Sequence, residues 1–120
     1  MSENVSKQIR SEVTKEGKLL IYIEATEIPE PKEDEVLIRI EASPINPSDL
    51  GLLLGPADVS SMSVSGVGEE AVVSMEIPKG LLRMLETRID QSLPVGNEGG
   101  GVVVKAGSEN LESLVGKTVG

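Results

Sequence analysis

The sequence predicts a mainly β fold with short helices, and two observations support this prediction. Short runs rich in Val, Ile and Leu recur along the chain and are separated by Gly, Pro or charged turn residues, which is typical of strands joined by turns. Residues 35–41 also alternate apolar and polar side chains, as a half-buried strand does. Tyr22 is the only aromatic residue among 120, so we expect one small domain of modest stability with an aliphatic core.

The N-terminal part of the chain is predicted to form a β-hairpin. Residues 7–14 resemble a weak strand, and residues 19–24 form a strongly β-prone run. Residues 15–18 separate them as a turn, in which Gly17 can take a positive φ. We expect Tyr22 to pack within the sheet and to have no chemical role.

A linker and the half-buried strand lead to the first segment of functional interest. Residues 28–34 carry two prolines and a charge run, which do not continue a strand. In the strand at 35–41, Val36, Ile38 and Ile40 are expected on the buried face. The loop that follows contains two prolines, and Pro47 can open a short helix over 47–54.

Residues 51–92 are expected to be an insert with a mobile loop and a helix. The loop is predicted at 60–68, which are small, polar and glycine-spaced, and a strand is predicted at 71–77. The loop lacks the lysine of a phosphate-binding loop. The helix is predicted at 78–90. Its apolar stripe either packs on the sheet or covers a pocket for an apolar substrate, and consists of Leu81, Leu82, Leu85 and Ile89.

The C-terminal part is predicted to contain a strand at 99–106, entered through three glycines. Its three consecutive valines at 102–104 are typical of a strand buried on both faces. A turn at 107–110 follows, and another strand begins near 115. Because the sequence ends inside this apolar run, we expect an incomplete domain.

Composition excludes several classes of function. The formal net charge of −9 opposes binding to nucleic acid or to an anionic membrane surface. The absence of Cys and His removes disulfides, thiolate catalysis and the usual zinc ligands. No apolar run is long enough to span a bilayer and no signal peptide is present, so a cytoplasmic location is expected.

Three segments resemble the medium-chain dehydrogenase/reductase superfamily, in its zinc-free quinone oxidoreductase branch. They are EVLIRIEA at 35–42, INPSD at 45–49 and PVGNEGGGVV at 94–103. The resemblance extends from about residue 18 to residue 120 and is interrupted by 51–92. It implies a partial GroES-like β-barrel, the N-terminal substrate domain of a medium-chain reductase. The Rossmann domain that holds the cofactor in this superfamily is expected to be absent from these residues.

The resemblance also implies roles for individual residues. Asn46 stands where zinc-dependent relatives have a Cys, and Asn97 stands where they have a His, while Glu98 is retained. Catalytic zinc is therefore not expected. Asn46, Ser48 and Asp49 are the catalytic candidates, with Ser48 at the position of a proton relay. Asn46 and Asn97 are the substrate-binding candidates, because their amides can polarise a carbonyl oxygen during hydride transfer from NADPH.

Structural roles for the same residues stay open. Asn46 can cap a loop, and Ser48 or Asp49 can bond the first turn of the helix. The glycines at 99–101 precede a strand and not a helix, so they do not form a dinucleotide fingerprint.

The sequence therefore indicates two candidate functions. The first is the substrate-side domain of an NAD(P)H-dependent quinone oxidoreductase, acting on a small-molecule quinone or enone, with the 120-residue chain inactive by itself. The alternative is a free-standing GroES-like module for binding or oligomerisation, such as a homodimer in which a second copy covers exposed apolar edges. The sequence does not identify the acceptor or distinguish NADPH from NADH.

Overall fold

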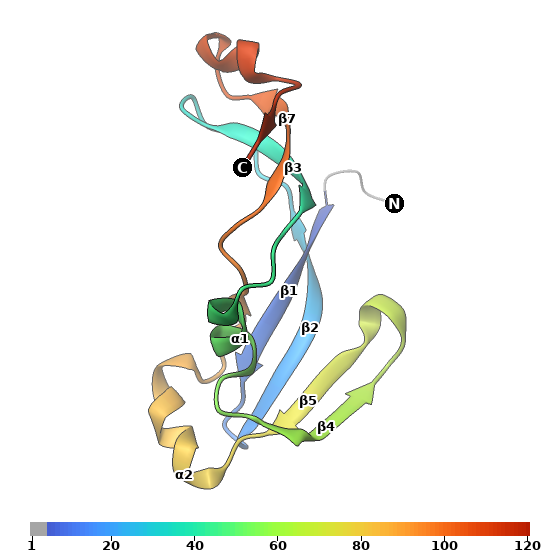
Figure 1. Cartoon of the computed structure of the whole chain (residues 1–120), viewed down its shortest axis with the longest axis vertical. Coiled ribbons are helices and arrows are strands. Elements are labelled where there is room, and N and C mark those ends of the chain that lie inside the picture. Colours follow the sequence, from blue (N-terminus) through green and yellow to red (C-terminus); the bar gives the residue numbers. More distant parts are fainter. Residues whose placement is uncertain (1–4) are drawn as a thin grey trace. The chain divides into compact units, whose positions relative to one another are not determined.

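The computed structural model describes residues 5–120, and the chain forms two compact units (Figure 1). Unit 1 contains the chain up to Thr26 together with Asn46–Val95, and unit 2 contains Glu27–Ile45 together with Gly96–Gly120. Each unit is built on one antiparallel sheet. The predicted mainly β fold with short helices is confirmed, whereas the strands of the described residues form no closed barrel.

Unit 1 contains a five-stranded sheet with the strand order β4-β5-β2-β1-β6. The predicted N-terminal hairpin is present as β1 and β2, and Gly17 in its turn has φ +84°. The predicted helix α1 has the expected bounds, Pro47–Leu54. The strands are β1 Val5–Val13, β2 Lys18–Glu27, β4 Asp58–Ser65, β5 Val72–Glu76 and β6 Leu93–Pro94.

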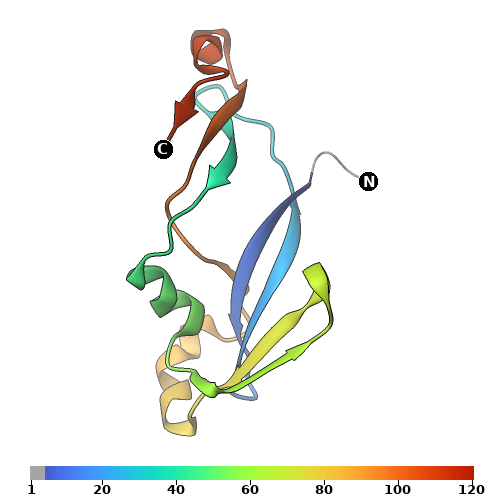
Figure 2. The same ribbon diagram turned by 45° about the vertical axis from the view of Figure 1, so that its right-hand side comes forward.

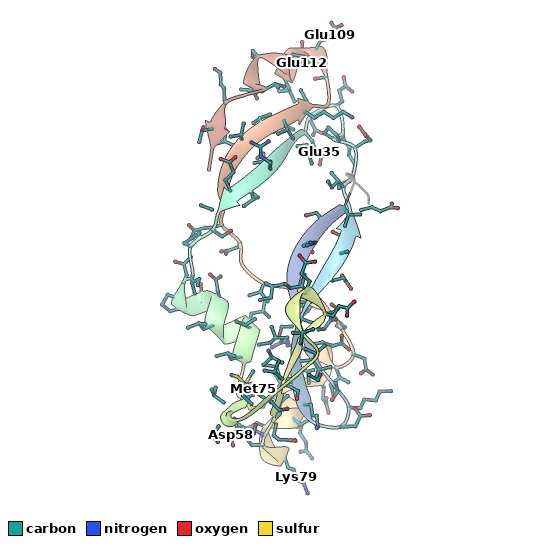
Figure 3. The ribbon with its side chains drawn as sticks, turned by 90° about the vertical axis from the view of Figure 1, so that its right-hand side faces the viewer. Glu35, Asp58, Met75, Lys79, Glu109 and Glu112 are labelled. Carbon is teal, nitrogen blue, oxygen red and sulfur yellow. The ribbon has the colours of Figure 1, made fainter. Side chains whose placement is uncertain are left out.

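The core of unit 1 is aliphatic, as its composition predicts. Its buried members come from β1, β2 and β5 and from the residue after β5, and Figure 3 labels Met75 among them. They are Val13, Leu19, Met75 and Ile77. Leu19 and Met75 are cross-strand partners, so pairing of β2 with β5 brings together two fully buried side chains.

The prediction of one continuous helix at 78–90 is wrong. The segment is one turn of α-helix, α2 Lys79–Leu82, followed by the 3₁₀ helix η2 Arg83–Arg88. The 3₁₀ turns change the periodicity, and Met84 is 75% exposed. The apolar stripe nevertheless packs against the core, and Figure 2 shows this segment beside α1. Packing on the sheet, and not a lid, is thus the role of the stripe.

The mobile loop predicted at 60–68 is also wrong. Most of this segment is β4, which pairs antiparallel with β5 and places Val64 opposite Val73. The hydroxyls of Ser63 and Ser74 lie 2.9 Å apart across the pair, so serine supplies cross-strand hydrogen bonds here. Residues 51–92, expected to be an insert, lie in unit 1 and supply two of its five strands. The 3₁₀ helix η1 Gly68–Glu70 follows β4.

Unit 2 contains a three-stranded sheet with the order β3-β7-β8. Its 3₁₀ helix η3 connects β7 to β8, and Figure 3 labels Glu109 and Glu112 on it. Gly101 lets β7 approach β3 closely, because a Cβ at this position would lie 2.1 Å from the Arg39 carbonyl oxygen. The elements are β3 Val36–Ala42, β7 Gly100–Ala106, η3 Glu109–Leu114 and β8 Thr118–Val119.

Both burial predictions for unit 2 are wrong, although its strands lie where expected. On the face of β3 that was expected to be buried, Ile40 is 54% exposed and Ile38 is 36% exposed. Of the three consecutive valines in β7, Val103 is buried and Val104 is 40% exposed. The physical reason is that a three-stranded sheet with one short 3₁₀ helix has too few apolar groups to cover both faces.

Candidate functional site

The first predicted loop forms the N-terminus of α1 in unit 1. Asn46 is the N-cap residue, with extended φ and ψ of −101° and 154°, and Pro47 is the first helical residue. The Asp49 carboxylate accepts a hydrogen bond of 2.9 Å from the Asn46 backbone N–H, and the two residues form a capping box. This local chemistry explains why the helix begins at Pro47.

The capping geometry gives two of the three catalytic candidates a structural role. Asp49 is half-buried and its carboxylate supports the helix start, which is the structural alternative that the sequence left open. Ser48 is exposed on the first turn. The catalytic roles of Asn46, Ser48 and Asp49 stay predictions.

The second predicted segment contributes to a hollow within unit 2. The hollow has a volume of about 690 Å³. Small residues and backbone dominate its lining, with Asn97 and Glu98 as the larger polar side chains. The lining residues are Ala42, Ser43, Pro44, Asn97, Glu98, Gly99, Gly100 and Gly120.

Strand pairing builds the floor of this hollow. Ala42 at the end of β3 lies opposite Gly100 at the start of β7. A Cβ on Gly99 would lie 3.2 Å from Ile40 Cδ1, so a side chain there would press on β3. Asn97 is exposed and can therefore present its amide N–H groups to a ligand oxygen. Sequence reasoning placed Ala42 and Ser43 in the first segment of functional interest but did not name them as site residues, because the β3–β7 register that brings them to the hollow is a long-range property.

The two substrate-binding candidates lie in different units. Asn46 belongs to unit 1 and Asn97 to unit 2. Their joint action on one carbonyl oxygen stays a prediction from the resemblance.

Unit 1 also contains a buried polar cluster that the sequence did not reveal. Ser11 is fully buried in β1, and its hydroxyl lies 3.0 Å from the Leu53 carbonyl oxygen at the end of α1. Arg88 Nη2 donates to the Ser11 hydroxyl at 3.2 Å and to the Leu52 carbonyl oxygen at 3.1 Å. Burial lowers the pKa of the Arg88 guanidinium. These hydrogen bonds give partners to backbone carbonyls in the last turn of α1, which lack partners within the helix. They also place the Arg88 guanidinium at the C-terminal end of α1, where the helix dipole is negative.

A second polar cluster surrounds Tyr22. Its hydroxyl lies 2.7 Å from a Glu12 carboxylate oxygen and 2.7 Å from the Ser92 hydroxyl. The phenol has one proton, so it donates to Glu12 and accepts from Ser92. Arg10 donates to the Ser92 carbonyl oxygen at 3.2 Å, and its Nε lies 3.1 Å from a Glu24 carboxylate oxygen. These contacts join the segment before β6 to β1 and β2, in agreement with the predicted packing of Tyr22 in the sheet.

A comparison with protein-family models and with curated proteins found no match for this chain. Within residues 5–120, no group of three or more His, Cys, Asp or Glu side chains is placed to hold a metal ion. No helix in the same range has the length and apolar character needed to cross a membrane.

Proposed function

We propose that this chain is the substrate-side part of an NAD(P)H-dependent quinone oxidoreductase. In this proposal the chain has a GroES-like architecture, and hydride transfer to a quinone or conjugated carbonyl proceeds without zinc. The observation that carries the proposal is the hollow of unit 2, which Asn97 lines at the position that the resemblance assigns to substrate binding.

The size and lining of the hollow support this proposal. Its volume of about 690 Å³ is within the roughly 300–1,000 Å³ typical of small-molecule sites. A floor of small residues with few polar groups suits a flat, largely apolar acceptor. An aromatic-rich pocket is not available to a chain that has no Phe or Trp.

Two of the polar groups at the hollow suit reduction of a carbonyl, whereas the Glu98 carboxylate cannot donate to an oxyanion when ionised. Hydride transfer to a quinone places negative charge on a quinone oxygen, which then takes a proton from water. The Asn97 amide and the Ser43 hydroxyl, both at the hollow, can donate hydrogen bonds to that oxygen. Hydrogen-bond donors at this oxygen stabilise the developing charge more than they stabilise the neutral quinone.

The described residues do not fit the dinucleotide cofactor. Gly99 leads into β7, and its neighbours Gly100 and Gly101 are part of that strand. A pyrophosphate-binding turn requires glycines between a strand and a helix N-terminus. The proposal therefore assigns only the acceptor side of the reaction to these residues, and steady NADPH oxidation by the chain alone is not expected.

Binding of a quinone to the purified chain tests the proposal. We expect a water-soluble benzoquinone to shift the NMR signals of the Asn97 side-chain amide and of the Gly99 and Gly100 backbone amides. Asn97→Ala should weaken binding by about three- to tenfold, the effect of losing one hydrogen bond of about 1 kcal/mol. The absence of Cys means that no thiol can add to the quinone.

Asn110→Ala is the matched control. Asn110 is an exposed asparagine of the same unit that does not line this hollow, so its replacement should leave quinone affinity unchanged. Shifts confined to unit 1, or equal losses of affinity in both variants, would contradict the proposal.

A further inference from the structure

The side chains that line the hollow of unit 2 carry formal charge of one sign. Among the lining residues found in the described part of the chain, Glu98 has the one ionisable side chain, and none is Lys or Arg. The other polar side chains there, the Ser43 hydroxyl and the Asn97 amide, are neutral. A ligand in the hollow therefore meets a negative side chain and no positive one.

The rest of unit 2 has the same sign of charge. The residues of this unit include nine carboxylate side chains and four cationic ones, a formal net charge of −5. Two of the cations are paired with carboxylates of the same unit, Arg39 with Glu41 and Lys105 with Glu30. None of the four cations lines the hollow. The electrostatic potential that unit 2 produces at its own hollow is therefore negative.

Salt decides which of these charges a bound ligand experiences. At an ionic strength of about 0.15 M the Debye length is about 8 Å, so charges farther away on the surface are largely screened. Glu98 is exposed, but it stands at the wall of the hollow and is close to any ligand inside. An exposed charge at such short range changes affinity by a few-fold, not by orders of magnitude.

We infer, on the basis of the proposed function, that the hollow selects neutral or cationic acceptors over anionic ones and that Glu98 sets this preference. The substrate class is then a quinone or conjugated carbonyl without an acidic substituent. Asn97 and Ser43 act on the carbonyl oxygen, which all these acceptors share, so they do not distinguish between them. A sulfonate or carboxylate on the acceptor brings a second anion beside Glu98, whereas an ammonium group brings an opposite charge.

Three methylated benzoquinones that differ in one ring substituent test this preference. The substituents are a neutral hydroxymethyl group, a side chain with a sulfonate and a side chain with a trimethylammonium group. NMR titration of the 120-residue chain gives each Kd from the Gly99 and Gly100 amide signals, so binding elsewhere on the acidic surface is not counted. At about 0.15 M ionic strength, the sulfonate should bind about three- to tenfold more weakly than the neutral quinone. The trimethylammonium quinone should bind at least as tightly as the neutral one.

Substitutions of nearly the same shape assign the preference to its residue. Glu98→Gln should bring the ratio of the sulfonate Kd to the trimethylammonium Kd at least about threefold closer to one. Asn97→Asp adds a carboxylate at the neighbouring lining position and should widen this ratio. Glu112→Gln is the matched control, because it removes the same charge from an exposed residue of η3 that does not line the hollow (Figure 3). The control should leave the ratio unchanged, and the ratio is taken within each variant so that a general loss of affinity cancels.

The outcomes distinguish the charge preference from the proposed function. If the neutral quinone shifts the Gly99 and Gly100 signals but the ratio is near one, or is the same in Glu98→Gln as in the parent chain, the charge preference is wrong and the proposed function stands. Tighter binding of the sulfonate than of the trimethylammonium quinone would also overturn the preference. If none of the three quinones shifts these signals, the proposed function fails and the charge preference fails with it.

Discussion

At the residue scale, Tyr22 links the chemistry of one side chain to the stability of the fold. Burial is the main cause that raises the pKa of its phenol, and the Glu12 carboxylate adds to the effect, while the Ser92 hydroxyl opposes it. A raised pKa means that the folded state favours the protonated phenol. The resulting stabilisation is fully present below pH 10, the pKa of an unperturbed tyrosine, and is lost as pH rises toward the folded-state pKa.

Ultraviolet titration measures this pKa directly, because the chain has one Tyr and no Trp. We expect the phenolate absorbance of the folded protein to rise with a midpoint above that of the same chain in urea. Glu12→Gln should move the folded midpoint part of the way back, since it removes the negative charge beside the phenol. A folded midpoint at or below the midpoint in urea would contradict the described environment of Tyr22.

Ser11 is the second residue whose environment leads to a specific prediction. Its buried hydroxyl bonds a carbonyl oxygen of α1 and accepts from Arg88, so Ser11→Ala removes a partner from buried polar groups. We expect the free energy of unfolding to fall by roughly 1–3 kcal/mol in urea denaturation. Ser63→Ala removes a hydroxyl from the exposed pair of Ser63 and Ser74. This change should lower the free energy of unfolding by about 0.5 kcal/mol or less. Equal effects of the two changes would show that the Ser11 cluster is not formed.

At the scale of elements, local signals predicted some features correctly. Helix α1 was predictable because Asn46, Pro47 and Asp49 supply the cap, the first residue and the reciprocal carboxylate within four positions. The hairpin turn at Gly17 was predictable because a glycine there can take φ +84°. These signals depend on neighbouring residues and need no knowledge of the rest of the fold.

Elements that depend on distant partners were not predictable in the same way. Strand β4 is rich in serine, and its partner β5 decides its conformation through contacts such as Ser63 with Ser74. The hollow depends on the β3–β7 register that places Ala42 opposite Gly100. Asn97 was found through its motif, whereas Ser43 was recognised only as part of the loop after the predicted strand at 35–41 and not as a site residue.

At the scale of the whole molecule, apolar burial is unequal between the two units. Unit 1 contains the buried cluster of Val13, Leu19, Met75 and Ile77. In unit 2, Val103 is the buried large apolar side chain among the described residues. Since apolar burial is the main favourable term in folding, the structure predicts that unit 1 is the more stable of the two.

Native-state hydrogen exchange tests this difference. Amides of β2 and β5 should exchange more slowly than those of β3 and β7, because opening unit 1 exposes more apolar surface. Met75→Ala should lower the opening free energy of unit 1 by roughly 2–5 kcal/mol, because Met75 is 1% exposed. Met84→Ala is the matched control at a 75% exposed position. Slower exchange in β3 and β7 than in β2 and β5 would show that buried area does not set the relative stability of the units.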